Sequence, residues 1–274
     1  MKKLILNLLI LFFFVVFLIS FWKFGTTMRS YYDSQDSYSQ LDGYISYDEP
    51  AETTGTDLYV QEQEPVNNQV EPEHAVEPDL TGWPQVDFFH LSLINEDVVG
   101  WLVIEGTNIN YPVVQGTDND YYLNHLFDGT YNSAGCLFLD FRCEADFSDK
   151  HSIIYGHHMK NKSMFADLVE YKKQAFYDEH PIALLMTPDA YYKIQLFSGY
   201  VADDSANAWD LMLEDKDFNT WAKAVQKKSR FQTDHFPEEE DRIITFSTCT
   251  YEFDNAKFVV HGYITEEILL PSNE

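Results

Sequence analysis

The chain of 274 residues is poor in cysteine, basic residues and glycine. Its three cysteines are too few for a fold held together by a framework of disulfides. Lys and Arg number 18 against 45 Asp and Glu, so the net charge is −27, and a surface this acidic repels phosphate backbones. We therefore expect no nucleic-acid partner. Glycine-rich phosphate-binding loops and internal repeats are also absent from the sequence.

Apolar residues are abundant. They make up 45% of the chain, and aromatic residues make up 16%, including 21 Phe and 18 Tyr. This composition fills a sizeable core and excludes global disorder. The length favours one domain with additional segments.

One long hydrophobic run occupies residues 4–22, with lysines on both sides of it. As a helix, the run spans about 28 Å, which is nearly the thickness of the hydrocarbon core of a bilayer. No Ala-x-Ala cleavage pattern follows it. We therefore predict an uncleaved signal anchor over residues 1–28, with a cleaved signal peptide or a buried soluble helix as the alternatives. The lysines on both flanks leave the orientation open.

Residues 29–81 have a different composition. They contain 13 Asp and Glu against one Arg, with many Ser, Gln and Pro and no apolar periodicity. A segment of this kind buries too little surface to offset the entropy of its chain. We predict an acidic disordered spacer here, with a short acidic interaction motif as the alternative.

Residues 82–274 have the pattern of a globular domain. Apolar residues at helical spacing predict short helices over 86–94 and over 163–177, the second with Ser163 as N-cap, and a longer helical region or two helices over 207–228. β-Branched and apolar runs predict strands, the first two forming a hairpin. The predicted strands are 98–104, 109–114, 136–140, 152–155, 191–201, 243–248 and 258–264. The strands outnumber the helices, so we predict a mainly antiparallel β domain with appended helices.

Cysteine chemistry is the first candidate for a function. Cys249 ends an apolar strand, where a thiol is held rigidly and is still accessible, although a lone cysteine is more often a small buried apolar residue. Cys136 lies in a predicted strand and is expected to fill the core. Cys143 lies in a polar loop and is the better candidate for an exposed thiol. A bridge between Cys136 and Cys143 remains open.

A nucleophilic cysteine needs a group that manages protons and a nearby cation. His157 and His158 follow a predicted strand and Gly156, which favours them over the other histidines of the chain. Lys257, eight residues after Cys249, is the nearest cation downstream of it, although its position alone is more typical of a surface lysine.

Metal ligands are not apparent. No pair of residues has the CxxC or HExxH spacing of a zinc site, and the acidic stretch at 118–120 lacks the ligand order of an EF-hand. We predict neither a metal nor a cofactor.

Several motifs resemble those of one known family. TFSTC at 245–249 resembles the TLxTC signature of sortases, with Phe246 where leucine is usual. YGHHM at 155–159, followed by SMF at 163–165, resembles the histidine segment of class B sortases. Further similar motifs are NEDVVGW at 95–101, YPVVQG at 111–116, DNDYYL at 118–123, DFR at 140–142 and YEFDNA at 251–256. The resemblance covers about residues 86–265 in the order of the family, so the chain is identified as a member of the class B sortases.

The resemblance implies a mainly β fold: an eight-stranded sortase-type β-barrel with appended α-helices, one of them in the 207–228 region, preceded by one transmembrane helix. It implies a catalytic domain over 82–274, held outside the cell by a single-pass membrane helix. The expected partners are secreted proteins with a C-terminal sorting motif and an amine of the peptidoglycan cross-bridge. For some family members the amine belongs to a pilin lysine.

The resemblance also implies roles for residues. Cys249 attacks the scissile carbonyl and forms a thioacyl intermediate, and His157 transfers protons, with His158 as the alternative. Ser247, Thr248 and Thr250 are the expected substrate-binding residues. Lys257 occupies the position of the family's arginine; it keeps the charge but loses the planar fork of donors, so we expect a slowed enzyme. A hydrolase and a non-catalytic module that binds sorting signals are the alternatives.

Overall fold

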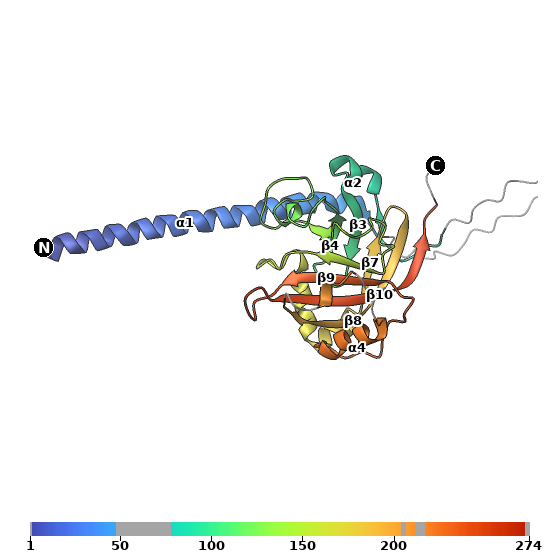
Figure 1. The fold of residues 1–274 in the computed structure, drawn as a ribbon. Coiled ribbons are helices and arrows are strands. Elements are labelled where there is room, and N and C mark those ends of the chain that lie inside the picture. The colour runs from blue at the N-terminus through green and yellow to red at the C-terminus, as the bar shows by residue number, and fades with distance from the viewer. Residues whose placement is uncertain (1, 48–77, 204–206, 212–216, 272–274) are drawn as a thin grey trace, which may run out of the picture.

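The computed structural model describes residues 2–47, 78–203, 207–211 and 217–271 of the chain. Its centre is a closed barrel of eight strands in the order β10-β8-β7-β3-β4-β5-β6-β9 (Figure 1). The strands are β3 (Val98–Val103), β4 (Asn110–Val114), β5 (Leu137–Leu139), β6 (His151–Tyr155), β7 (Ile182–Met186), β8 (Ala190–Ala202), β9 (Ile243–Cys249) and β10 (Lys257–Leu269). All neighbours are antiparallel except the β4–β5 and β6–β9 pairs. The predicted eight-stranded barrel is confirmed.

The barrel closes around an apolar interior. Side chains alternate along each strand, so one face of β9 points inward and the other outward. Ile244 and Phe246 point inward and pack with Phe258 and Val260 of β10. Ile243 points outward and packs under α4 (Phe218–Lys228). The outward face also carries Thr245, Ser247 and Cys249, which follow Ile243 at intervals of two residues.

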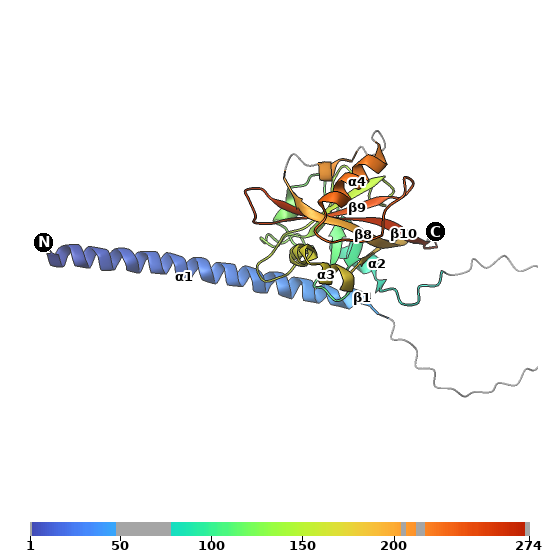
Figure 2. The ribbon, with the colours of Figure 1, turned by 90° about the horizontal axis from the view of Figure 1, so that it is seen from below.

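The helices explain how much of this outward face is accessible. Helix α4 lies on the outside of the barrel beside β8 (Figures 1 and 2). It begins at its N-cap Asp217, whose carboxylate accepts a hydrogen bond from the backbone N–H of Thr220. Its apolar side covers the start of β9, and the short 3₁₀-helix η4 (Asn207–Trp209) lies beside the middle of β9, at Ser247. The end of β9, at Cys249, is the partly exposed part of the strand.

The helix over 163–177 was only partly predicted. The structure has a 3₁₀-helix η3 (Phe165–Lys172) followed by α3 (Gln174–Glu179). Ser163 is not the N-cap, because its hydroxyl donates to the side chain of Asn161, and Met164 takes the cap position without a side-chain bond. The helix predicted over 86–94 is α2 (Phe88–Ile94), which is capped by Asp87.

The predicted spacer is wrong in its first part. Helix α1 (Lys2–Leu41) continues well beyond residue 28 and is followed by the 3₁₀-helix η1 (Asp42–Tyr44) and by β1 (Ile45–Ser46), which pairs with β2 (Gln85–Val86). The cause is packing: Leu41 and Ile45 are buried, and the hydroxyl of Tyr38 donates to the carbonyl of Gly135 at 2.6 Å. The predicted spacer residues 48–77 lie outside the described residues.

The N-terminal half of α1 projects away from the barrel as a long straight helix (Figures 1 and 2). Its apolar side chains between Leu4 and Phe24 are exposed. By length and composition this helix is long and apolar enough to cross a membrane.

Candidate active site

Cys249 and Lys257 face each other across the last hairpin of the barrel. Cys249 is the last residue of β9 and Lys257 the first residue of β10, and their Cα atoms are direct partners in the antiparallel ladder. Directly opposed side chains lie on the same face of a sheet. The Nζ atom of Lys257 accordingly lies 3.1 Å from the Sγ atom of Cys249, in position to donate to the sulfur.

His157 reaches the same place from the neighbouring strand. Strand β6 runs parallel to β9, with Tyr155 opposite Ser247, and the N–H of Gly156 donates to the carbonyl of Ser247 at 3.1 Å. A Cβ atom at position 156 would lie 2.4 Å from the side chain of Leu137 and 2.7 Å from the ring of Phe165. Glycine at this position avoids both clashes. The chain can therefore leave β6 here and place His157 beside the end of β9.

The ring of His157 has a defined protonation pattern. Its Nε2 atom lies 2.8 Å from the carbonyl oxygen of Leu123. A carbonyl accepts hydrogen bonds only, so Nε2 carries a proton in this contact. The Nδ1 atom is consequently the one that can take up or release a proton in the cavity.

His158 has a different environment. Its Nδ1 atom donates to the backbone carbonyl of Cys249 at 3.1 Å, and its ring lies 5.3 Å from that of Tyr251. It thus contacts the backbone of the cysteine, whereas His157 lines the cavity in front of it. The geometry favours His157 over His158 as the proton-transfer residue.

A cavity of about 280 Å³ brings these groups together. A cavity of this size accommodates a few side chains of an extended peptide. Its lining residues are Asn119, Leu123, Phe138, Tyr155, Gly156, His157, Ser247, Thr248, Cys249 and Lys257. Three residues proposed from the sequence for catalysis and two of the three proposed for substrate binding are therefore neighbours around one cavity.

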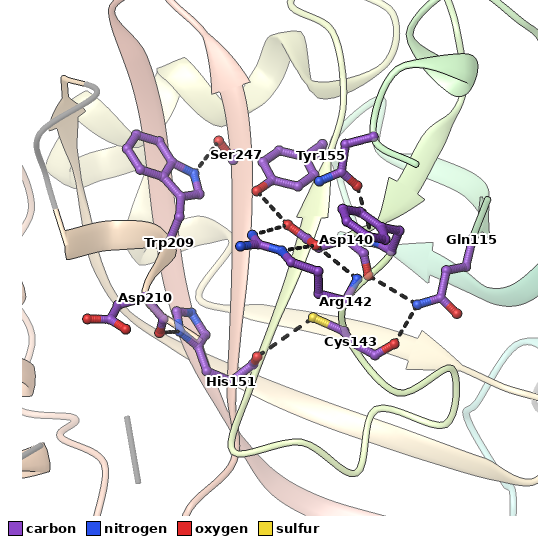
Figure 3. Close-up of polar contacts among 11 residues, drawn as sticks. Gln115, Asp140, Arg142, Cys143, His151, Tyr155, Trp209, Asp210 and Ser247 are labelled. Carbon is purple, nitrogen blue, oxygen red and sulfur yellow. Dashed lines mark hydrogen bonds and ion pairs between the residues drawn. The ribbon is translucent and has the colours of Figure 1, made fainter. Parts of the chain in front are cut away.

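Ser247 is oriented by Trp209, which no motif in the sequence connects with the site. The indole Nε1 of Trp209 donates to the hydroxyl oxygen of Ser247 at 3.1 Å (Figure 3). An indole N–H is a donor only, so Ser247 is the acceptor and its own hydroxyl proton remains available for another group. Because Ser247 lines the cavity, that proton is suited to a carbonyl oxygen of a bound peptide.

Thr248 and Thr250 differ from Ser247. Thr248 alternates with its neighbours and points to the opposite face of β9; its buried hydroxyl has no hydrogen-bond partner among the described residues. Thr250 is not part of the cavity lining, and its hydroxyl is bonded to Lys172 and Glu252. The structure therefore gives Thr250 a role in holding the β9–β10 connection instead of the predicted contact with substrate.

Lys172 fixes this connection from the side of η3. It forms an ion pair with Glu252, and its Nζ atom lies 5.2 Å from the centre of the Phe258 ring. Partial burial raises the pKa of Glu252, but the hydrogen bonds from Lys172 and Thr250 outweigh it and lower this pKa to about 2. Glu252 is thus ionised at neutral pH, and the pair steadies the segment that joins Cys249 to Lys257.

A second polar cluster supports the wall of the cavity. The guanidinium of Arg142 binds the buried carboxylate of Asp140 through two hydrogen bonds of 2.8 and 2.7 Å, and the hydroxyl of Tyr155 donates to the same carboxylate at 3.0 Å (Figure 3). Burial raises the pKa of Asp140, but the bonds from Arg142 dominate and hold it below its usual value. The cluster fixes the Tyr155 ring. The DFR motif at 140–142 was its only sequence signal, and it did not reveal the partner.

The other two cysteines are not nucleophiles. Cys136 and Cys143 are buried and unbridged. The expectation that Cys143 is exposed is wrong, because the loop that carries it folds back onto the barrel and its thiol lies 3.9 Å from the carbonyl of His151. Burial raises the pKa of both thiols to about 12. Among the described residues, no group of three or more His, Cys, Asp or Glu side chains is arranged to hold a metal ion.

Comparison with known proteins agrees with this geometry. The sequence model of the sortase domain matches residues 102–265, which is more than half of the chain. Sortase B of Listeria monocytogenes is 33% identical over 250 residues, covering 90% of this chain and 91% of that protein. Sortase B of Staphylococcus aureus is 37% identical over 163 residues, covering 59% and 67%.

A solved structure described as a Staphylococcus aureus sortase B–substrate complex superimposes with a TM-score of 0.62 at 36% identity, over 65% of this chain and 84% of that one. The barrel, the cysteine at the end of β9 and these similarities lead to one conclusion. The chain belongs to the sortase family and is a class B sortase, a cysteine transpeptidase of the family that anchors surface proteins to the cell wall.

Proposed function

We propose that this protein is a membrane-anchored transpeptidase that cleaves a C-terminal sorting motif of secreted proteins and joins them to an amine of the peptidoglycan cross-bridge. The observation that carries the proposal is the convergence of Cys249, His157 and Lys257 on one cavity, with Lys257 Nζ 3.1 Å from Cys249 Sγ. A nucleophile, a proton-transfer group and a cation together are sufficient for acyl transfer.

In the first half of the reaction, the Sγ atom of Cys249 as thiolate attacks the scissile carbonyl carbon of the sorting motif. A C–S bond forms and the carbonyl oxygen becomes an oxyanion. When the tetrahedral intermediate collapses, the C–N bond breaks and the leaving nitrogen takes a proton from Nδ1 of His157. The product is a thioester on Cys249 and a released peptide with a new amino terminus.

In the second half, an amine attacks the thioester carbon and gives its proton to His157. The C–S bond breaks, and the thiolate of Cys249 is restored. The hydrogen bond from Nε2 of His157 to the carbonyl of Leu123 keeps the ring in place during both transfers. The new bond is an amide, so no external energy source is required.

Lys257 supplies the positive charge. Its ammonium group lies next to the sulfur and therefore next to the carbonyl that the sulfur attacks, where a donor stabilises the developing oxyanion. An ammonium is a point charge, unlike the planar guanidinium expected from the family at this position. We propose that this enzyme is active but slower than it would be with arginine.

The proposed location rests on α1. We propose that its projecting apolar half crosses the membrane once and that the barrel lies on the outer side. The exposed apolar side chains between Leu4 and Phe24 support this placement, because outside a membrane they would all be in contact with water. The packed half of α1, including Tyr38 and Leu41, would then hold the barrel close to the membrane surface.

The proposal can be tested with the full chain in detergent micelles. The protein is mixed with a panel of sorting-motif peptides, with and without a triglycine acceptor, and mass spectrometry is used to search for an acyl adduct on Cys249. We expect an adduct that is converted to ligated peptide when the acceptor is present. The Cys249→Ala variant is the control and should form neither species.

Two results would contradict the proposal. Release of free acid at the same rate with and without acceptor indicates a hydrolase. Peptide binding that persists in Cys249→Ala, with no adduct on the intact enzyme, indicates a module that only holds sorting signals.

A further inference from the structure

A chain of buried polar side chains crosses the outward face of the barrel beneath α4. His151 begins β6, Thr245 lies in β9 and His261 lies in β10, and none of the three is more than 1% exposed. The Nε2 atom of His151 lies 2.7 Å from the hydroxyl of Thr245, and Nδ1 of His261 lies 2.7 Å from the same hydroxyl. At the two ends, Nδ1 of His151 lies 2.7 Å from the carbonyl oxygen of Asp210, and Nε2 of His261 lies 3.4 Å from the hydroxyl of Tyr200.

When both rings are neutral, the carbonyl at one end fixes the direction of every bond. A carbonyl can only accept, so Nδ1 of His151 donates to Asp210, and Nε2 of the same neutral ring must accept from Thr245. The hydroxyl oxygen of Thr245 then accepts from Nδ1 of His261. The remaining nitrogen of His261 accepts from Tyr200. In this pattern of two neutral histidines, each ring and the hydroxyl of Thr245 are used once as donor and once as acceptor.

Burial maintains this state. It lowers the pKa of His151 to about 3, and it lowers the pKa of His261 well below its usual value, where the neighbouring His151 and Lys228 of α4 act in the same direction. In these tautomers every hydrogen bond of the row points the same way. The row therefore ends with the N–H of His151 Nδ1 donating to the carbonyl of Asp210.

That carbonyl belongs to the residue after Trp209. The indole of Trp209 donates to the hydroxyl of Ser247 (Figure 3). The backbone carbonyl of Ser247 accepts a hydrogen bond from the N–H of Gly156. Residues 209 and 210 are thus fastened to the barrel at two points, His151 at the start of β6 and Ser247 on β9. Of these two points, Ser247 lies in the cavity, two residues before Cys249.

We propose that His151 is a positioning residue for substrate: through its bond to the Asp210 carbonyl it holds Trp209 on Ser247, and thereby directs the hydroxyl proton of Ser247 toward a backbone carbonyl of the bound sorting peptide. The proposal deepens the proposed function, on which its substrate rests. Thr245 and His261 set the tautomer of His151 and do not themselves approach the cavity.

Two substitutions at one position separate this role from simple packing. His151→Asn places an amide N–H where Nδ1 was and keeps a donor for the Asp210 carbonyl, although it loses the bond to Thr245. His151→Phe keeps an aromatic ring and removes the donor. Trp209→Phe removes the indole N–H at the other end of the link. Far-ultraviolet circular dichroism of the full chain in micelles verifies that each variant is folded.

The first readout does not depend on activity. With 5-fluorotryptophan in the protein, the ¹⁹F resonance of Trp209 is identified by its absence from Trp209→Phe. We expect this resonance to keep its position in His151→Asn and to shift or broaden in His151→Phe. An unchanged Trp209 resonance in a folded His151→Phe variant overturns the proposal, whether or not any peptide is turned over.

The second readout uses the peptide reaction. His151→Phe and Trp209→Phe should each raise KM about fivefold, the effect of one neutral hydrogen bond, with kcat changed by less than about twofold. His151→Asn should stay close to the wild type. Because both residues act through one link, the double variant should be no worse than the more impaired single variant. Multiplied effects in the double variant, or equal losses in His151→Asn and His151→Phe, contradict the proposal.

Failure of the proposed function looks different. If the wild type forms no adduct with any peptide, the reaction assigned to Cys249 is wrong, while the Trp209 resonance still decides whether His151 holds the segment. If the wild type is active and both readouts are indifferent to the donor at position 151, only the positioning role is wrong.

Discussion

Lys257 and Cys249 are held side by side by strand register, because they are opposite residues at the loop end of the β9–β10 hairpin. The 3.1 Å between Nζ and Sγ therefore depends on the backbone ladder and on the connection that Lys172 and Glu252 steady. A side chain with the same charge at position 257 stays near the sulfur whatever its shape. Shape decides only how well it reaches an oxyanion.

Replacing Lys257 tests how much the shape matters. We expect Lys257→Arg to raise kcat/KM for the sorting peptide, because the guanidinium offers several donors in a fixed plane. Lys257→Met should lower kcat by about 10²–10³, the usual cost of losing an oxyanion donor. Lys160→Arg, an exposed lysine in the loop after the histidines, is the matched control and should be neutral. Unchanged or slower turnover in Lys257→Arg shows that lysine does not limit the rate.

Thiol alkylation tests which cysteine reacts. Burial raises the pKa of Cys136 and Cys143 from 9.0 to about 12, which lowers their thiolate populations about 10³-fold relative to an ordinary thiol. Iodoacetamide at pH 7.5, followed by peptide mapping, should label Cys249 alone in the folded protein and all three cysteines in denaturant. Labelling of Cys143 in the folded state would mean that its loop does not pack as described.

The sequence was informative where local pattern decides structure and uninformative where distant segments meet. Cys249 and His157 could be found because each follows a recognisable strand within a specific motif. Strand β7 was missed because Ile182–Met186 is a short apolar run beside helical residues, and such a run has no periodicity that distinguishes strand from helix. Residues 29–41 looked like a spacer because their many Ser and Gln residues conceal the few apolar positions, such as Leu41, that pack on the barrel.

The residues that orient the groups of the site could not be predicted from the sequence either. His151 and His261 lie more than a hundred positions apart and meet only because β6, β9 and β10 are neighbours in the closed barrel. Nothing local marks Trp209 as a partner of Ser247. Motifs therefore identify the reacting groups, whereas the groups that orient them depend on the barrel's topology.

Two truncations test the boundary at the N-terminus. Removing residues 2–28 deletes the projecting apolar part of α1 and should leave the melting temperature of the barrel nearly unchanged. Removing residues 2–47 also exposes the surfaces under Tyr38, Leu41 and Ile45 and deletes β1. At about 1.5–3 kcal/mol for each large apolar side chain, we expect the melting temperature to fall by on the order of 10 °C. Equal melting temperatures of the two truncated proteins would show that residues 29–47 act only as a spacer.

Acid stability tests whether His151 is neutral in the folded protein. Its folded pKa of about 3 lies below the 6.5 of an exposed histidine, so between these values the unfolded state binds more protons than the folded state. The stability that the neutral ring preserves is complete above pH 6.5 and is lost as the pH falls toward 3. Between pH 7.5 and pH 5 this loss amounts to about 2 kcal/mol for one histidine.

His261, whose folded pKa is also lowered, loses stability over the same pH interval in both wild type and variant, whereas Asp140 and Glu252 lose theirs mainly below their ordinary pKa values of 3.8 and 4.5. The comparison of wild type with His151→Asn isolates the histidine. Urea unfolding at the two pH values should show the wild type losing about 2 kcal/mol more than His151→Asn, since asparagine does not titrate. Equal losses would mean that His151 is protonated in the fold, and a protonated ring is incompatible with the donor pattern that links it to Thr245, since both of its nitrogens would then donate.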